Sequence, residues 1–241
     1  MARFAGLQAS AMIATTRFVF LHLHKSGGSF VNDVLLKFLP DAREIGYHLP
    51  RRLLPPALAQ LPTLGFVRNP WSYYVSWYSF QARLPSPNPL FLTLSDGGQL
   101  SFSDTIRNML DLGTGGTRLD ALIAALPQHY TGRGLNLPGP ALEPIRASGL
   151  GFYSYLYRYL YDGPGILFIR PMERLRDNLV PMLEGLGQPV SARMEQYIHT
   201  APAVNASVHE AYVEYYDAAL RDLVAERDAG LIKLYGYAFG S

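Results

Sequence analysis

The sequence predicts an α/β domain of three layers, built on a central parallel sheet that carries a helical insertion. Three short apolar segments, 18–23, 63–67 and 166–169, are typical of strands buried on both faces of a parallel sheet. A polar turn and then a segment with helical periodicity follow each of the first two. The length of 241 residues suits one such domain, and the apolar content of 49% permits a sizeable core.

The turn after the first strand combines several features that favour anion binding. It reads His24-Lys-Ser-Gly-Gly-Ser29, and a helix-like pattern begins directly after it. A strand, a glycine-rich turn and a helix together direct backbone N–H groups and the positive end of the helix dipole at an anion. Lys25 adds a positive charge, and Ser26 and Ser29 add hydroxyl donors. The turn therefore predicts a phosphate or sulfate site, although an ordinary strand–helix turn with a surface lysine is the competing interpretation. It is not a Walker A loop, because its lysine precedes the glycines.

A second polar group follows the strand at 63–67. Asn69 is a good helix N-cap and Pro70 fits the first helical position, so we expect a helix over 70–83. Arg68 then lies at the carboxyl end of a strand, where open α/β sheets bind ligands, and Ser76 lies two turns into the helix. The pair predicts a second phosphate site, with a structural arginine and a helix-packing serine as the alternative.

The remaining segments give a coarser prediction. A short strand over 44–47 is expected to end at His48, and residues 9–14 are interpreted as part of an N-terminal extension. The helix after the third strand should end or kink near Leu179, because Pro181 follows. A capping-box pattern at 207–210 predicts a long helix to about residue 228. The aromatic segment 152–161 predicts a helix with Tyr153 and Tyr157 facing outward.

Taken together, the two polar sites resemble those of sulfotransferases that use 3′-phosphoadenosine-5′-phosphosulfate, above all the carbohydrate (Golgi-type) and related bacterial enzymes. The turn His24-Lys-Ser-Gly-Gly-Ser29 is similar to their 5′-phosphosulfate loop, in which Lys-Thr-Gly-Gly-Thr is usual. Arg68-Asn-Pro with Ser76 eight residues after the arginine is similar to their 3′-phosphate motif. The sequence departs from the family pattern at His24, where proline is common. It also departs in Trp71-Ser-Tyr-Tyr, which lacks the arginine often found before the serine.

This resemblance implies a P-loop-like core in a single domain over 1–241. Residues 17–83 and 163–241 would form the nucleotide-binding core, and residues 84–162 the acceptor-binding insertion. The implied reaction moves a sulfuryl group from the nucleotide donor to an acceptor hydroxyl of a glycan or a small metabolite. The residues implied to hold the 5′-phosphosulfate are Lys25, Ser26, Gly27, Gly28, Ser29 and Phe30, and those implied to hold the 3′-phosphate are Arg68 and Ser76. Lys25 would also neutralise the charge that develops on the leaving phosphate, which makes it a catalytic residue.

Such a reaction needs a base to accept the proton of the acceptor hydroxyl, and we predict that His48 is this base. A neutral imidazole is well matched to accepting a proton near neutral pH, and His48 follows a strand at the end where the other site residues converge. It also lies between the two donor motifs, where glycan-modifying members of the resembled family often carry their basic His or Glu. Glu44 and His24 are the alternatives, and a surface histidine before a Leu-Pro turn is the structural interpretation.

Composition limits the other classes of function. A net charge of +2 is too small to indicate nucleic-acid binding by bulk electrostatics. The absence of cysteine excludes disulfides and thiolate catalysis, and it fits the reducing cytoplasm where we expect this protein. No apolar run approaches the length of a membrane-spanning helix, and no cluster with ligand spacing indicates a metal. Two alternatives stay open: a nucleotide-dependent phosphotransferase, and a non-catalytic interaction protein on the same scaffold.

Overall fold

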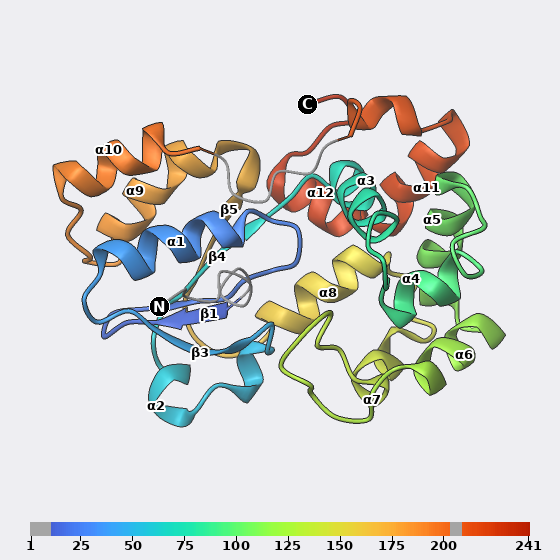
Figure 1. Cartoon of the computed structure of the whole chain (residues 1–241), viewed down its shortest axis with the longest axis horizontal. Helices are drawn as coiled ribbons and strands as arrows, with labels where there is room; N and C mark the ends of the chain where they lie inside the picture. The colour runs from blue at the N-terminus through green and yellow to red at the C-terminus, as the bar shows by residue number, and fades with distance from the viewer. Residues whose placement is uncertain (1–10, 203–208) are drawn as a thin grey trace. The chain divides into compact units, whose positions relative to one another are not determined.

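The computed structural model describes residues 11–202 and 209–241, which fall into two compact units (Figure 1). The first unit comprises residues up to Arg68 together with Tyr157 onward as far as 202. The second comprises Asn69–Leu156 and the C-terminal residues from 209. Of the helices in these described ranges, none has both the length and the apolarity needed to cross a membrane.

The first unit contains a five-stranded sheet with the order β3-β1-β2-β4-β5. Its strands are β1 (Ala11–Ala14), β2 (Val19–Phe20), β3 (Arg43–Tyr47), β4 (Thr63–Val67) and β5 (Leu167–Pro171). Its helices are α1 (Gly28–Phe38), α2 (Pro56–Ala59), α9 (Leu175–Gly185) and α10 (Ala192–Thr200), with the end of α8 (Phe152–Tyr161). The expectation of a mixed helix-and-strand fold around a sheet is thus confirmed.

The sheet is only partly parallel, which corrects the prediction of a parallel one. Strands β2, β4 and β5 are parallel neighbours, as the three predicted apolar segments require. Strand β1, however, pairs antiparallel with both β2 and β3. It comes from the segment interpreted as an extension, and all four of its residues are buried. A tight turn joins it to β2, in which the Thr15 N–H donates to Phe18 O at 3.0 Å.

One face of the sheet is covered by α1, α9 and α10, as Figure 1 shows. Alternate residues of the strands, such as Ile13, Phe20 and Leu64, pack against buried side chains of these helices. Helix α9 continues to Gly185 through Pro181, so the predicted end near Leu179 is wrong, and the alternative of a kink there stays a prediction. Since Leu179, Met182 and Leu183 are all buried, apolar packing compensates for the hydrogen bond that the proline removes.

The second unit is helical in the part that the structure describes. Its helices are α3 (Pro70–Gln81), α4 (Pro89–Leu94), α5 (Phe102–Leu110), α6 (Thr117–Ala125), α7 (Gly139–Leu142), the first half of α8, α11 (Ala218–Arg227) and α12 (Ala229–Tyr235). Helix α3 begins as predicted, because the Asn69 side chain accepts the Trp71 N–H at 3.1 Å. Tyr153 was predicted to face outward but is fully buried, and its ring stacks on Tyr73 with 3.8 Å between centroids.

A buried carboxylate between α11 and α12 bonds to two further helices of this unit, α3 and α8. Asp228 is fully buried between α11 and α12, and it accepts the Tyr74 hydroxyl at 2.7 Å and the Ser154 N–H at 2.9 Å. The second bond caps the beginning of α8, where the first N–H groups have no partner inside the helix. Burial raises the pKa of Asp228, whereas the bonds from Ser154 and Tyr74 lower it, and the net direction is upward.

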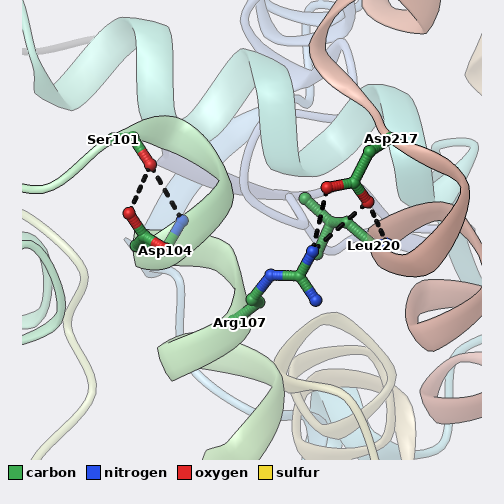
Figure 2. Close-up of polar contacts among 5 residues, drawn as sticks. All are labelled: Ser101, Asp104, Arg107, Asp217 and Leu220. Atoms are coloured by element: carbon green, nitrogen blue, oxygen red, sulfur yellow. Dashed lines mark hydrogen bonds and ion pairs between the residues drawn. The ribbon is translucent and has the colours of Figure 1, made fainter.

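The sequence predicts one long helix over 207–228, and this prediction is wrong for residues 209–228. Residues 207 and 208 lie outside the described ranges. A 3-10 turn at Tyr212–Tyr215 precedes α11, which begins only after Asp217. The Asp217 carboxylate accepts the Leu220 N–H at 2.6 Å and also pairs with Arg107 of α5 at 3.0 Å (Figure 2). Asp217 therefore acts as the N-cap, a role for which aspartate is well suited, and its extended backbone ends any helix coming from before it.

Candidate active site

The predicted anion loop joins β2 to α1 in the first unit. After Phe20 the chain stays extended, since the Leu21 N–H still donates to Leu64 O at 3.0 Å. The turn closes with the Ser26 N–H on Leu23 O at 3.3 Å, and α1 begins at Gly28. The start of a helix directs N–H groups along its axis toward an anion, although in α1 the N–H groups of Phe30 and Val31 already donate to Gly27 O. The strand, turn and helix predicted from the sequence are thus present.

Two residues of the loop adopt the left-handed conformation. Lys25 has φ of 59° and Gly27 has φ of 79°. A side chain at Gly27 would also bring its Cβ within 2.6 Å of Leu175 Cδ1. Gly28 has a different constraint, because a Cβ there would overlap the ring of His22. Both glycines are therefore required by the geometry of the loop.

Arg68 contacts this loop from the neighbouring strand. It follows β4, and its guanidinium Nη1 donates to the main-chain carbonyl of Lys25 at 3.2 Å. Burial, followed by the positive charge of Arg68, lowers the pKa of Lys25 to about 8. The two predicted cationic residues are therefore brought together at the head of α1, in surroundings where an anion would stabilise both.

His48 directly follows β3 and lies beside the loop. The residue is 4% exposed, and its side-chain Nδ1 is 2.6 Å from the carbonyl oxygen of His22. Since a carbonyl only accepts, Nδ1 carries the proton and Nε2 keeps its lone pair. Burial lowers the pKa of His48 to about 4, while the bond to His22 opposes this shift. The imidazole is thus neutral at pH 7 and available as a base through Nε2.

Three histidines gather here, a grouping that the sequence analysis did not predict. The His24 ring stacks on His48 with 3.6 Å between centroids, and the His22 ring lies 4.8 Å from His48. Burial, followed by the charges of His48 and Lys25, holds the pKa of His22 well below its usual value. His22 lies in the segment 18–23, which the sequence predicts to be a buried strand, and it is buried. Its carbonyl and ring also fix His48 and the start of α1. Within the described ranges, no group of three or more histidine or acidic side chains is arranged to hold a metal ion.

Tyr161 of α8 supports the strand ends that carry the loop and Arg68. Its hydroxyl lies 3.2 Å from both Leu21 O and Phe66 O, the carbonyls just past or near the ends of β2 and β4. Gly65 makes room for it, because a Cβ there would lie 2.5 Å from the Tyr161 oxygen. No sequence motif predicts this role of Tyr161. The one available signal is Gly65, a strand glycine that leaves space for a large side chain from a distant segment.

The other predicted site residues lie as follows. Ser26 is buried and its hydroxyl donates to His24 O at 3.2 Å, and Ser29 is half-buried in the first turn of α1. The Phe30 N–H donates to Gly27 O at 3.1 Å inside that turn. Glu44 is exposed on β3, four residues before His48. Ser76 lies fully buried on α3 in the second unit, and its assignment to a phosphate stays a prediction.

Comparison with known proteins adds little to these observations. No protein-family model and no curated protein matches the chain. Among solved structures, the crystal structure of mouse sulfotransferase SULT7A1 complexed with PAP is similar, with 14% identity over 92% of this chain and 86% of that chain and a TM-score of 0.47. A likeness this weak assigns the chain to no family, so its function has to be inferred from the residues of the site.

Proposed function

We propose that the chain is a sulfotransferase that moves a sulfuryl group from 3′-phosphoadenosine-5′-phosphosulfate to an acceptor hydroxyl of a glycan or a small metabolite. One observation carries the proposal: Arg68 and Lys25 meet at the head of α1, with Arg68 Nη1 on Lys25 O at 3.2 Å. Burial and the neighbouring charge destabilise the Lys25 ammonium, as its pKa of about 8 indicates. A donor with several anionic groups would remove both penalties, which favours a polyanionic ligand at this loop.

The loop supplies the groups that such a donor needs. The N–H groups of Gly27, Gly28 and Ser29 and the Lys25 ammonium would hold the 5′-phosphosulfate. Phe30 is also assigned to it by the motif, although its N–H is taken up by Gly27 O. Arg68 would hold the 3′-phosphate, since guanidinium groups suit phosphate oxygens. The sequence motif assigns Ser76 to the same phosphate.

The proposed chemistry uses one base and one cation. His48 would accept the proton of the acceptor hydroxyl at Nε2 while that oxygen forms its bond to sulfur. Lys25 would stabilise the negative charge that the phosphate gains as its own bond to sulfur breaks and it takes the electron pair. An anion bound at the neighbouring loop would raise the pKa of His48 from about 4 toward neutrality, which strengthens the base when the donor is present.

Calorimetry with the reaction product 3′-phosphoadenosine-5′-phosphate tests the donor site directly. We expect saturable binding that ATP does not match, and at least tenfold weaker binding to Lys25→Ala, the effect of about one lost hydrogen bond to a charged group. Lys37→Ala is the matched control, because Lys37 is exposed in the last turn of the same helix, roughly 13 Å along its axis from Gly28. Preference for ATP would point instead to a phosphotransferase.

Turnover requires a second measurement. Radiolabelled donor and a panel of glycans and hydroxylated metabolites should give a labelled acceptor with the wild-type chain and none with Lys25→Ala. Tight binding of the bisphosphate without transfer to any of these acceptors would instead favour a non-catalytic protein.

A further inference from the structure

A cavity of about 270 Å³ lies in the second unit, apart from every residue of the proposed donor loop. It is lined by Asn88 and Pro89 at the start of α4 and by residues of the segment between α6 and α7. Figure 1 shows these three helices as neighbours, and α6 packs against both α4 and α7. Ligand pockets usually measure roughly 300–1,000 Å³, so this one suits a single ring rather than an extended chain.

The floor and the rim of this cavity differ in chemistry. Leu126, Leu135 and Leu137 are buried and give it an apolar floor. His129 and Arg133 are exposed at its rim, and no described residue that lines it is acidic. The side chains of His129 and Arg133 make no hydrogen bond or ion pair with any residue in the described ranges. An arginine that lines an apolar cavity with no carboxylate in the lining can pair with an anion bound there.

The loop that carries Arg133 is held in shape by its own hydrogen bonds. Asn136 is buried with φ of 48°, and its side-chain oxygen accepts the N–H groups of Thr131 at 2.8 Å and Gly132 at 2.9 Å. The Arg133 carbonyl accepts the Asn136 N–H at 3.1 Å, and the Gly139 N–H closes the segment on Pro127 O at 2.9 Å. A site that is already ordered loses less entropy when it binds.

We propose that this cavity binds a small molecule made of one apolar ring and one anionic group, a phosphate or a carboxylate. The ring would lie against the leucines of the floor, and the anion would pair with Arg133, with His129 as a second donor. The inference goes beyond the proposed reaction and does not depend on it, because the donor loop contributes nothing to the cavity. Failure of either proposal therefore leaves the other standing.

Methyl NMR on the full chain tests it, with phenyl phosphate as the probe. We expect saturable shifts in the methyl signals of Leu126, Leu135 and Leu137. Phenol, which lacks the anion, and inorganic phosphate, which lacks the ring, should each bind at least about tenfold more weakly. Benzoate separates the two anion chemistries, since the ratio of its affinity to that of phenyl phosphate shows which of them the cavity prefers.

A pair of charge-removing variants locates the anion. Arg133→Gln should weaken phenyl phosphate about tenfold, the effect of one hydrogen bond to a charged group. Arg193→Gln, which changes another exposed arginine, on α10 of the first unit, should leave the affinity unchanged. Absence of saturable shifts at the three leucines, equal affinity for phenol, or an unchanged affinity in Arg133→Gln would each overturn the proposal.

Discussion

The Arg68 guanidinium holds the Lys25 carbonyl at 3.2 Å, and Lys25 itself is in the left-handed conformation with φ of 59°. Non-glycine residues adopt this conformation only when their surroundings stabilise it. The arginine at the end of β4 therefore helps to fix the backbone of the lysine that follows β2. A substitution at Arg68 should consequently change both the charge of the site and the shape of the loop.

Removing Arg68 should weaken binding of the bisphosphate product. For Arg68→Ala we expect a loss of about 1.5–3 kcal/mol, the range for a hydrogen bond to a charged group. Calorimetry should be run with the 3′,5′-bisphosphate and with the nucleotide that lacks the 3′-phosphate. The wild-type chain should prefer the first and the variant should lose that preference. Equal affinity of the wild-type chain for both nucleotides would remove the 3′-phosphate assignment.

Donor-site affinity should fall as pH rises through about 8. Lys25 has a pKa of about 8 without ligand, and bound anions would raise it, so binding takes up a proton above that pH. Affinity for the bisphosphate should be constant between pH 7 and about 8 and should then fall up to tenfold per pH unit. Lys25→Arg keeps its charge throughout and should show no such fall. If affinity falls with pH equally in the wild type and in Lys25→Arg, the group that titrates is not Lys25.

Loss of the His48 base should reduce turnover by about 10²–10⁴-fold, the usual scale for general-base catalysis. His48→Asn is the sharper variant, because an amide can still donate to His22 O but has no basic nitrogen. Affinity for the bisphosphate should stay nearly unchanged, so the loss should appear in kcat. Near-normal turnover would transfer the role to Glu44 or His24, which Glu44→Gln and His24→Asn would then separate.

Gly28→Ala should destabilise the first unit, because the added methyl group overlaps the His22 ring. Overpacking of this kind costs typically 1–3 kcal/mol in urea unfolding. The double variant with His22→Ala should recover part of the loss, since the overlapping ring is then absent. Gly185→Ala is the control, because its new Cβ would meet only Phe168 at 3.8 Å. Additive effects of the two substitutions would contradict the assigned contact.

Asp228 should make stability depend on pH in the opposite sense from most carboxylates. Burial raises its folded-state pKa above the unfolded value, so its protonated form is favoured by folding. Its contribution should be greatest below the unfolded pKa, near 4, and should decline as pH rises toward the folded pKa. Urea unfolding of the wild type and Asp228→Asn between pH 4 and 8 should therefore show a difference that moves in favour of the variant with rising pH. A constant difference would contradict this.

Several elements of both units could be predicted because short-range sequence features determine them. Asn69 and Pro70 begin α3 through capping alone, and the apolar runs at β2, β4 and β5 pair as parallel neighbours. Strand β1 was missed because four apolar residues near a terminus carry no periodicity that distinguishes a strand from an extension. The long C-terminal helix was predicted from the capping-box pattern at 207–210, whereas the side chain of Asp217 caps a helix that begins only at Ala218.

The residues of the candidate site also fall into two groups, those that the sequence predicts and those that it does not. Lys25, the glycines, Arg68 and His48 could be chosen from motif and position, and the structure places all of them at one end of the sheet. The roles of His22 and Tyr161 could not be predicted, because they depend on contacts across the sheet. His22 acts through a carbonyl and a ring face, and Tyr161 reaches two strands from a segment some hundred residues away.

The pairing of β4 with β5 constrains how the chain can fold. Thr63 lies opposite Leu167, so this pairing must close a loop that contains Asn69–Leu156, the larger of the two segments of the helical unit. Contacts of such long sequence separation slow folding, because the entropy of closing the loop is lost before the contacts form. During synthesis, β1 to β4 leave the ribosome long before β5, which pairs with β4. The edge of β4 therefore stays unpaired until Pro171 has emerged. We therefore expect the helical unit to refold quickly and the sheet to refold slowly. Aggregation should be most frequent before β5 pairs with β4, because the edge of β4 is exposed until then.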